Sequence, residues 1–228
     1  MEKSKKNSTF AQFLKVQNSL SIFFMSDMKE QIVRFAAQQM DQLGIRSVSV
    51  DDICREFGIS KKTFYVHFET KDALLSAIIS LHEKKMEGEL EDIVKHKTVF
   101  QTIASWHAIA QRAKKSSDQK PPLIHDLQKY YPELFKAHER SVRQTMVRFL
   151  VRFLQKGIDE KMFRAEINVE MAASLFVDMH KALIQRADKQ KMSPAELREE
   201  GKHNMDILLR GIFTVEGFEE LHNKITKS

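Results

Sequence analysis

Two short helical segments joined at a glycine constrain this chain more than any other feature of its sequence. Ser49 precedes an acidic, partly apolar stretch, and Ser60 precedes a second stretch, 61–67, that begins with two lysines. Serine is a favoured residue just before a helix, and Gly58 permits the left-handed turn that a tight connection between helices needs. Residues 47–74 therefore predict helix, turn, helix and the start of a further helix, which is the arrangement of a helix-turn-helix.

The flanking residues supply a core for three packed helices. Apolar residues recur at three- and four-residue steps over 27–43, which predicts one amphipathic helix. Ser49 and Asp52 have the spacing of a capping box, and the acidic residue suits the positive end of the helix dipole. Phe64 and Phe68 lie four residues apart, so we expect both rings to close the core of the three-helix unit.

The remainder of the chain also predicts helices. The 228 residues include only 7 Gly and 4 Pro, and β-branched runs are few, which favours an all-α fold. The expected spans are 70–94, 97–115, 122–130, 132–157, 168–188 and 193–214. We expect three parts: a flexible N-terminal extension (1–26), a helix-turn-helix domain (27–72), and a larger helical domain for effector binding and dimerisation (73–228).

The positions of the charged residues are better evidence for a nucleic-acid interface than the total charge of the chain. The chain has a net charge of +6, yet residues 26–72 hold seven basic and eight acidic side chains. A nucleic-acid interface therefore depends on lysines gathered at two helix starts: Lys61 and Lys62 at one, and Lys71 at the other. A lysine in the first turn of a helix is unfavourable for the helix dipole, so we expect Lys71 and nearby backbone N–H groups to hold an external anion such as a DNA phosphate.

Several functional classes find no support in the sequence. The single cysteine, Cys54, excludes an intramolecular disulfide and favours a reducing cytoplasm; we expect a buried, inert thiol, with a redox sensor as the alternative. No apolar run reaches the roughly 18–20 residues that cross a bilayer. His82-Glu83 and His138-Glu139 lack the second histidine of a zinc-protease helix, and there is no glycine-rich phosphate loop. We therefore expect no catalysis, no metal site, no cofactor and no membrane partner.

With these residues in hand, the chain resembles the tetracycline-repressor (TetR) family of bacterial transcriptional regulators over about residues 29–75. The matching positions are Ile53, Gly58-Ile59-Ser60, Thr63-Phe64-Tyr65, His67-Phe68 and Lys71-Asp72-Ala73-Leu74. Two positions depart from the family pattern. Cys54 stands where the family usually has alanine, and Lys62 stands where many relatives carry a small residue, so the operator sequences of relatives do not transfer to this chain.

The resemblance implies that the second short helix enters the DNA major groove by its N-terminal end. Lysine can contact phosphate or guanine acceptors, and threonine can bond a base or pack on a thymine methyl group. The expected DNA-contacting residues are Ser49, Ser60, Lys61, Lys62, Thr63, Tyr65, His67 and Lys71. For Tyr65 a plain surface aromatic, and for His67 a packing histidine, stay open as alternatives.

The resemblance further implies a homodimer on a palindromic operator, acting most often as a repressor that a small apolar or amphipathic effector releases. The last two long helices would form the dimer interface, and the tentative interface residues are Leu175, Met179, Leu183, Leu208, Gly211 and Ile212. The helices from 97 to 188 would enclose the effector, and the tentative pocket residues are Phe100, Trp106, His107, Tyr130, Tyr131, Met146, Phe149, Phe176 and His180. Apolar residues at helical spacing are also what an ordinary core requires.

A helical interaction or structural protein without sequence-specific DNA binding is the main alternative. That reading leaves the lysines at the two helix starts unexplained. A salt titration of binding to nonspecific duplex DNA separates the two, because phosphate contacts make affinity fall as salt rises.

Overall fold

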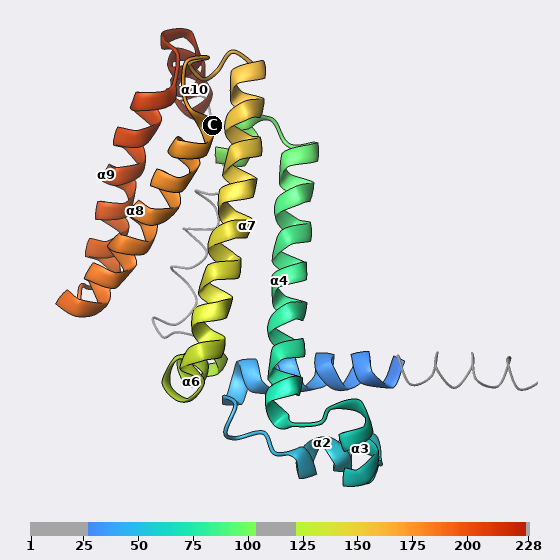
Figure 1. Cartoon of the computed structure of the whole chain (residues 1–228). Coiled ribbons are helices and arrows are strands. Elements are labelled where there is room, and N and C mark those ends of the chain that lie inside the picture. The colour runs from blue at the N-terminus through green and yellow to red at the C-terminus, as the bar shows by residue number, and fades with distance from the viewer. Residues whose placement is uncertain (1–26, 104–121, 227–228) are drawn as a thin grey trace, which may run out of the picture. The chain divides into compact units, whose positions relative to one another are not determined.

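The computed structural model describes residues 27–103 and 122–226, and helices make up most of both ranges. The all-α fold expected from the sequence is confirmed. Contacts divide the chain into two compact units (Figure 1). Unit 1 runs to His82 and also takes in 120–136, and unit 2 holds the rest. Among the described residues, no helix has the length and apolar character needed to cross a membrane.

Unit 1 contains the helix-turn-helix. Its helices are 27–43, α2 (Val50–Phe57), α3 (Lys61–His67), the first part of α4 (Lys71–His96) and α6 (Pro122–Tyr130). Phe64 is fully buried and Phe68 is nearly so, with ring centroids 5.6 Å apart, as expected. The sequence-based division placed α6 in the second domain, but Leu123 and Leu127 of α6 are buried in the core of unit 1.

Unit 2 is a helical bundle with a core rich in phenylalanine. Its helices are the rest of α4, a turn at 99–103, most of α7 (Pro132–Asp159), α8 (Val169–Gln190), α9 (Pro194–Ile212) and α10 (Val215–Thr226). The side chain of Asn168 caps α8, and Ser193 opens α9 with a full capping box, as the sequence predicts. The helix α10 was not predicted from the sequence as a separate element.

A glycine on α7 lets an aromatic ring lie directly on the helix backbone. A Cβ added at Gly157 would lie 2.0 Å from Cδ2 of Phe163. Phe163 in turn packs edge-on against Phe153 and Phe213, with centroids 5.5 and 4.9 Å away. The buried ring thus joins the end of α7 to the end of α9.

Within unit 2, α4 and α7 run parallel and are joined by polar contacts at roughly one-turn steps. The carboxylate contacts are Glu83 with His138 (2.8 Å) and Ser141 (2.9 Å), Glu87 with Arg148 (2.9 Å), and Glu91 with Arg152 (3.6 Å). At the C-terminal end of α4, the Nζ atom of Lys156 donates to the carbonyls of Val94 and Lys97 at 2.8 and 2.7 Å. Lysine here satisfies carbonyls that the helix itself leaves unpaired.

Candidate nucleic-acid interface

The start of α2 is fixed by a complete capping box. The Ser49 hydroxyl accepts a hydrogen bond from the Asp52 backbone N–H at 3.1 Å, and the Asp52 carboxylate accepts from the Ser49 backbone N–H at 3.0 Å. The Ser49 hydroxyl also donates to that carboxylate. These bonds lower the pKa of Asp52, and the bond with the Ser49 hydroxyl contributes most. The nearby Arg55 lowers this pKa further. Ser49 therefore has the capping role expected for it, and its hydroxyl is already engaged within the protein.

The turn and α3 follow the sequence prediction closely. Gly58 adopts the left-handed conformation (φ 60°) and ends α2. The Ser60 hydroxyl accepts from the Thr63 backbone N–H at 3.1 Å and also contacts the Thr63 hydroxyl at 2.9 Å. These bonds fix the first turn of α3, whose N-terminal end is the part that reaches base edges in helix-turn-helix proteins.

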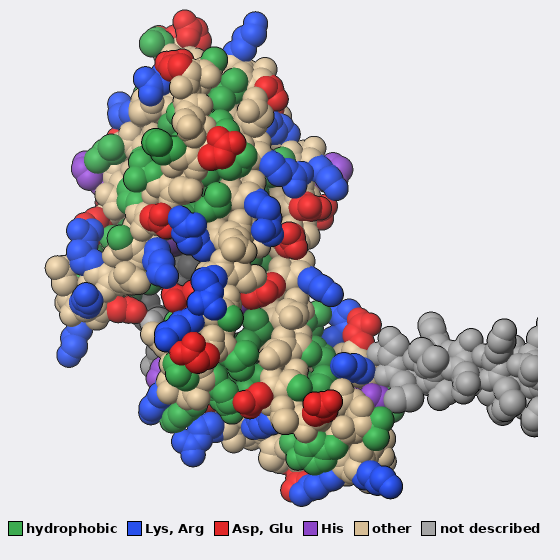
Figure 2. Space-filling model, in the orientation of Figure 1, with side chains coloured by type: hydrophobic (Ala, Val, Ile, Leu, Met, Phe, Trp, Pro, Cys, Tyr) green, Lys and Arg blue, Asp and Glu red, His purple; other side chains and the backbone are tan. Residues whose placement is uncertain are grey.

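The outer face of α3 combines cations with apolar groups. Lys61, Lys62 and Thr63 are exposed, Tyr65 is 48% exposed and Val66 is 63% exposed, while Phe64 between them is fully buried. Figure 2 shows hydrophobic and basic side chains together where α2 and α3 lie. Val66 was absent from the sequence-based set, although the alternation with buried Phe64 could have indicated that it points outward.

The two lysines that open α3 differ in their surroundings. The Lys61 ammonium forms a 2.8 Å ion pair with Asp51 of α2, which raises its pKa. Lys62 makes no ion pair with any residue in the described ranges. Lys62 is thus the lysine of α3 whose charge is available to an external anion without first breaking an internal contact. His67, at the end of α3, is half-buried.

Lys71 has a role that the sequence reasoning did not predict. Its Nζ atom donates to the backbone carbonyls of Ile45 and Val48 at 2.8 and 2.7 Å. Burial lowers its pKa. The expectation that Lys71 needs an external anion is therefore weakened, because two of the three N–H groups of its ammonium already donate to carbonyls of the turn before α2.

The residues proposed for an effector pocket are divided among several places. Trp106 and His107 lie outside the described residues. Tyr130 and Tyr131 belong to unit 1, where Tyr131 packs against the core and Tyr130 is 39% exposed. The others lie in unit 2, which does not bring all of them together: Phe149 and Phe176 are buried, Phe100 packs beside them, Met146 is half-buried, and His180 is exposed.

His180 is exposed, but its surroundings affect its imidazole. Part of it reaches solvent, yet burial lowers the pKa of its imidazole below the usual value of 6.5. A neutral imidazole there offers one hydrogen-bond donor and one acceptor.

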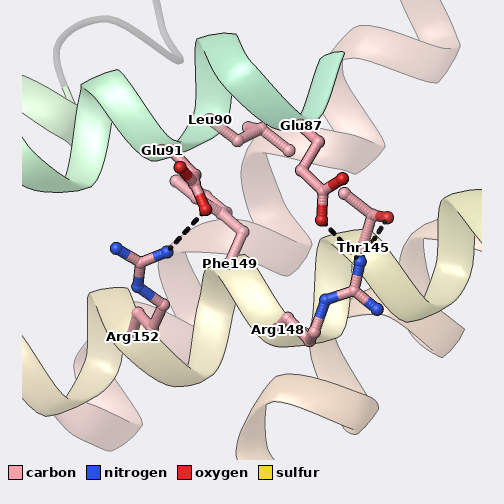
Figure 3. Close-up of a pocket in the computed structure, with 7 residues that line it drawn as sticks. All are labelled: Glu87, Leu90, Glu91, Thr145, Arg148, Phe149 and Arg152. Atoms are coloured by element: carbon pink, nitrogen blue, oxygen red, sulfur yellow. Dashed lines mark hydrogen bonds and ion pairs between the residues drawn. The ribbon is translucent and has the colours of Figure 1, made fainter. Parts of the chain in front are cut away.

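A small groove between α4 and α7 has a different lining from the one predicted. It measures about 140 Å³ and is lined by Glu87, Leu90, Glu91, Thr145, Arg148, Phe149 and Arg152 (Figure 3). Small-molecule pockets in proteins usually measure some 300–1,000 Å³ and are mostly apolar. Of the predicted pocket residues only Phe149 lies here, and ion pairs span the opening, so this groove does not match the expected effector cavity.

The predicted dimer residues separate into two groups. Leu183 and Ile212 are buried within the chain, and Leu208 packs against the same core as Ile212. Leu183 lies against Gly201 of α9, where an added Cβ would be 3.6 Å from its Cδ2 atom. The proposed interface is therefore corrected at Leu183 and Ile212, which are buried against their own chain, whereas Leu208 is half-buried and stays a prediction.

The other group remains available to a partner. Leu175 and Gly211 are exposed and Met179 is half-buried. Met171 and Ile207 add to this surface, with exposures of 70% and 55%. Figure 2 shows hydrophobic side chains gathered over α8 and α9.

Comparisons with known proteins agree with this geometry. Residues 32–78 match the family model for bacterial regulatory proteins of the tetR family. The uncharacterised HTH-type transcriptional regulator YerO of Bacillus subtilis (strain 168) is 33% identical over 73 residues, which is 30% of this chain and 25% of YerO. A second such regulator of that organism, YfiR, is 24% identical over 191 residues, covering 79% of this chain and 91% of YfiR.

Solved structures share the fold at low identity. Reduced NemR of E. coli has a TM-score of 0.58 at 15% identity, covering 82% of this chain and 97% of NemR. A transcriptional regulator from Cytophaga hutchinsonii ATCC 33406 has a TM-score of 0.62 at 18% identity, covering 81% and 98%. The match at residues 32–78 coincides with the helix-turn-helix of unit 1, so this part of the chain is similar to the TetR family of bacterial regulatory proteins.

Proposed function

We propose that the protein is a cytoplasmic, ligand-responsive repressor that binds a palindromic operator as a homodimer and is released by a small apolar or amphipathic effector. The observation that carries the DNA-binding part is the outer face of α3, where Lys62, Tyr65 and Val66 are all exposed on a helix fixed at its start by Ser60. Regulators of this family are generally not enzymes.

The chemistry of α3 supports contacts to both phosphate and bases. The Lys62 ammonium can bind a phosphate or guanine acceptors, and Val66 offers apolar contact to a thymine methyl group. The Tyr65 hydroxyl can donate to a phosphate while its ring leans edge-on against Phe64, 5.4 Å between centroids. Lys61 joins them when a phosphate replaces Asp51 as its partner.

The test is nuclease protection of the protein's own promoter region by a variant with Lys61→Ala and Lys62→Ala. We expect protection to be lost and the dimer to persist, because both side chains are exposed and remote from α8 and α9 in sequence. Protection equal to that of the wild type would show that α3 is not the recognition helix.

Repression itself is tested in cells. Transcription from the same promoter should rise when the gene is deleted and fall when it is restored. A fall on deletion would identify an activator instead.

Effector release is tested by adding fractions of a cell extract, separated by polarity, to the protein–promoter complex. If none of the fractions dissociates the complex, the result argues against an apolar effector.

The exposed apolar face of α8 and α9 supports the homodimer. Met171 and Leu175 lie four residues apart on α8, and Ile207 and Gly211 have the same spacing on α9, so each pair faces one way. A two-fold contact would bury both stripes and set two recognition helices about 34–36 Å apart, one DNA turn.

Sedimentation velocity checks this interface. Leu175→Glu with Ile207→Glu should convert the dimer to monomer, because burying four carboxylates per dimer is costly. Leu43→Glu is the matched control, since Leu43 is 56% exposed in unit 1 and should leave the dimer intact. A dimer that survives the double substitution would place the interface elsewhere.

A further inference from the structure

An aromatic ring of α6 holds two cations beside the turn that leads into α2. The guanidinium carbon of Arg46 lies 4.9 Å from the centroid of the Tyr130 ring, and the Lys129 ammonium lies 5.0 Å from the same centroid. Arg46 also donates from Nη1 to the Tyr130 hydroxyl at 3.3 Å. All three side chains are exposed and belong to unit 1.

The backbone under Arg46 is fixed as well. Its N–H donates to the Asp126 carboxylate of α6 at 3.3 Å. Gly44, two residues earlier, has φ +87°, and a Cβ there would lie 2.8 Å from the same carboxylate oxygen. The turn therefore lies close against α6, and the Arg46 guanidinium is held in place before any ligand arrives. A group held in this way loses less entropy on binding than a free side chain.

Several cations of unit 1 are neutralised within the unit, and this pair is not. Arg34, Arg55 and Lys61 each form an ion pair with a carboxylate of the same unit. Arg46 and Lys129 form none with any residue that the structure describes. Their contact with Tyr130 leaves their charge in place, and the two cations lower the pKa of its hydroxyl, Lys129 more than Arg46.

The position of the pair relates it to DNA. Arg46 precedes Ser49, the residue that caps α2, by three residues, so the two Cα atoms are at most about 11 Å apart. In helix-turn-helix proteins the first helix of the motif crosses the DNA backbone while the second enters the groove. A cation fixed this close to the start of α2 is placed to meet the same strand, and contacts of this kind set the register of a protein on its duplex.

We propose that Arg46 and Lys129, held on Tyr130, form a phosphate-binding site for operator DNA outside the helix-turn-helix, so that α6 is part of the DNA-binding surface. This inference rests on the proposed function. The site carries no base-reading group, so it strengthens binding to specific and nonspecific duplexes alike and adds to the salt dependence of both.

The test uses the full chain and fluorescence anisotropy with two duplexes, one from the protein's own promoter and one of unrelated sequence. Salt is varied from about 50 to 200 mM. Each phosphate contact contributes about 0.9 to the slope of log affinity against log salt. We expect Arg46→Met with Lys129→Met to reduce the magnitude of the slope by about 1 to 2 per subunit on both duplexes. Lys129→Met alone, at an exposed position that cannot disturb the core, should reduce it by about 1.

Arg34→Gln is the matched control. It removes one positive charge from an exposed residue of unit 1 that is already paired with Glu30, and the slope should not change. If Arg34→Gln reduced the slope as much as Lys129→Met, the effect would be one of net charge and the site would be refuted. Unchanged slopes in both methionine variants would refute it too. A wild-type protein whose DNA affinity does not depend on salt would instead overturn the proposed function.

Discussion

Replacing Lys71 with methionine removes the ammonium that joins the start of α4 to the turn before α2, and it keeps a side chain of similar length. Two carbonyls, those of Ile45 and Val48, then lose the donor that the structure gives them. Both residues have nearly no exposed surface, so water reaches these carbonyls poorly. The turn should therefore open more often, and α2 begins only two residues after Val48.

The size of this effect follows from the two bonds. A hydrogen bond from a charged donor contributes about 1.5–3 kcal/mol net. The ammonium is itself partly buried, as its lowered pKa indicates, and that desolvation offsets part of the gain. We therefore expect the variant to lose about 2–4 kcal/mol of local stability. Since each 1.4 kcal/mol is a factor of ten, amides of α2 should exchange roughly 30- to 700-fold faster.

Hydrogen exchange of Val50–Phe57 measures this directly, and Lys62→Met is the matched comparison. Each substitution lowers the net charge of +6 by one, but Lys62 is exposed and has no ion pair in the described part of the chain. We expect Lys62→Met to leave exchange within about threefold of the wild type while weakening binding to the promoter duplex, since surface changes rarely exceed 0.5 kcal/mol.

The opposite pattern would refute this reasoning. If Lys71→Met left α2 exchange unchanged and instead reduced the salt slope of DNA binding by about 1, as a lost phosphate contact does, then Lys71 would act on DNA and its bonds to the turn would be incidental.

Three further predictions concern stability and reactivity. Gly157→Ala should destabilise unit 2 by about 3 kcal/mol or more in urea unfolding, because its Cβ would overlap the ring of Phe163, whereas Gly88→Ala, exposed on α4 with open space around it, should stabilise by about 0.5–1 kcal/mol; equal effects would show that the ring moves aside freely. The thiol of Cys54 should react slowly with a thiol reagent at pH 8 and much faster in denaturant, since burial raises its pKa and limits access; fast labelling of the native protein would contradict that burial. The pKa of Asp52 is lowered in the folded state, so its contribution to α2 is present above the unfolded value of about 3.9 and is lost as pH falls through the folded value; in Asp52→Asn this acid-dependent loss of α2 protection should disappear.

Features encoded within a few residues could be predicted from the sequence. The capping serines, Ser49 and Ser193, depend on partners three residues away, and the structure has both boxes. Gly58 needed only the local requirement for a left-handed residue. Phe64 and Phe68 followed from spacing on two short segments, because so small a unit has one interior to fill.

Features that depend on distant partners could not. Lys71 bonds to carbonyls 23 and 26 residues earlier, and no local pattern reveals where that turn passes. Periodicity found apolar stripes on α8 and α9, yet it cannot tell a stripe that faces its own chain, such as Leu183, from one that faces outward, such as Leu175. The assignment of Tyr130 to a pocket failed to anticipate Arg46 for the same reason, since 84 residues separate the two.

The row of polar contacts between α4 and α7 has a consequence for how firmly the two helices are aligned. The carboxylates of Glu83, Glu87 and Glu91 repeat every four residues on α4, and the cations of Arg148, Arg152 and Lys156 do so on α7. Sliding α4 by one turn, about 5.4 Å, toward the C-terminal end of α7 would therefore place each carboxylate beside one of these cations. The exchanged pairs would be Glu83 with Arg148, Glu87 with Arg152, and Glu91 with Lys156. Exposed pairs of this kind contribute at most about 1 kcal/mol each, so they hold the helices together without distinguishing one alignment from the next.

Only the two ends of the row lack such an alternative. The hydrogen bonds of Glu83 with His138 at one end, and those of Lys156 with the carbonyls of Val94 and Lys97 at the other, would both be lost in the slide. Among these polar contacts, the ones at the two ends therefore select the observed alignment of α4 and α7, whereas the middle pairs would tolerate either alignment.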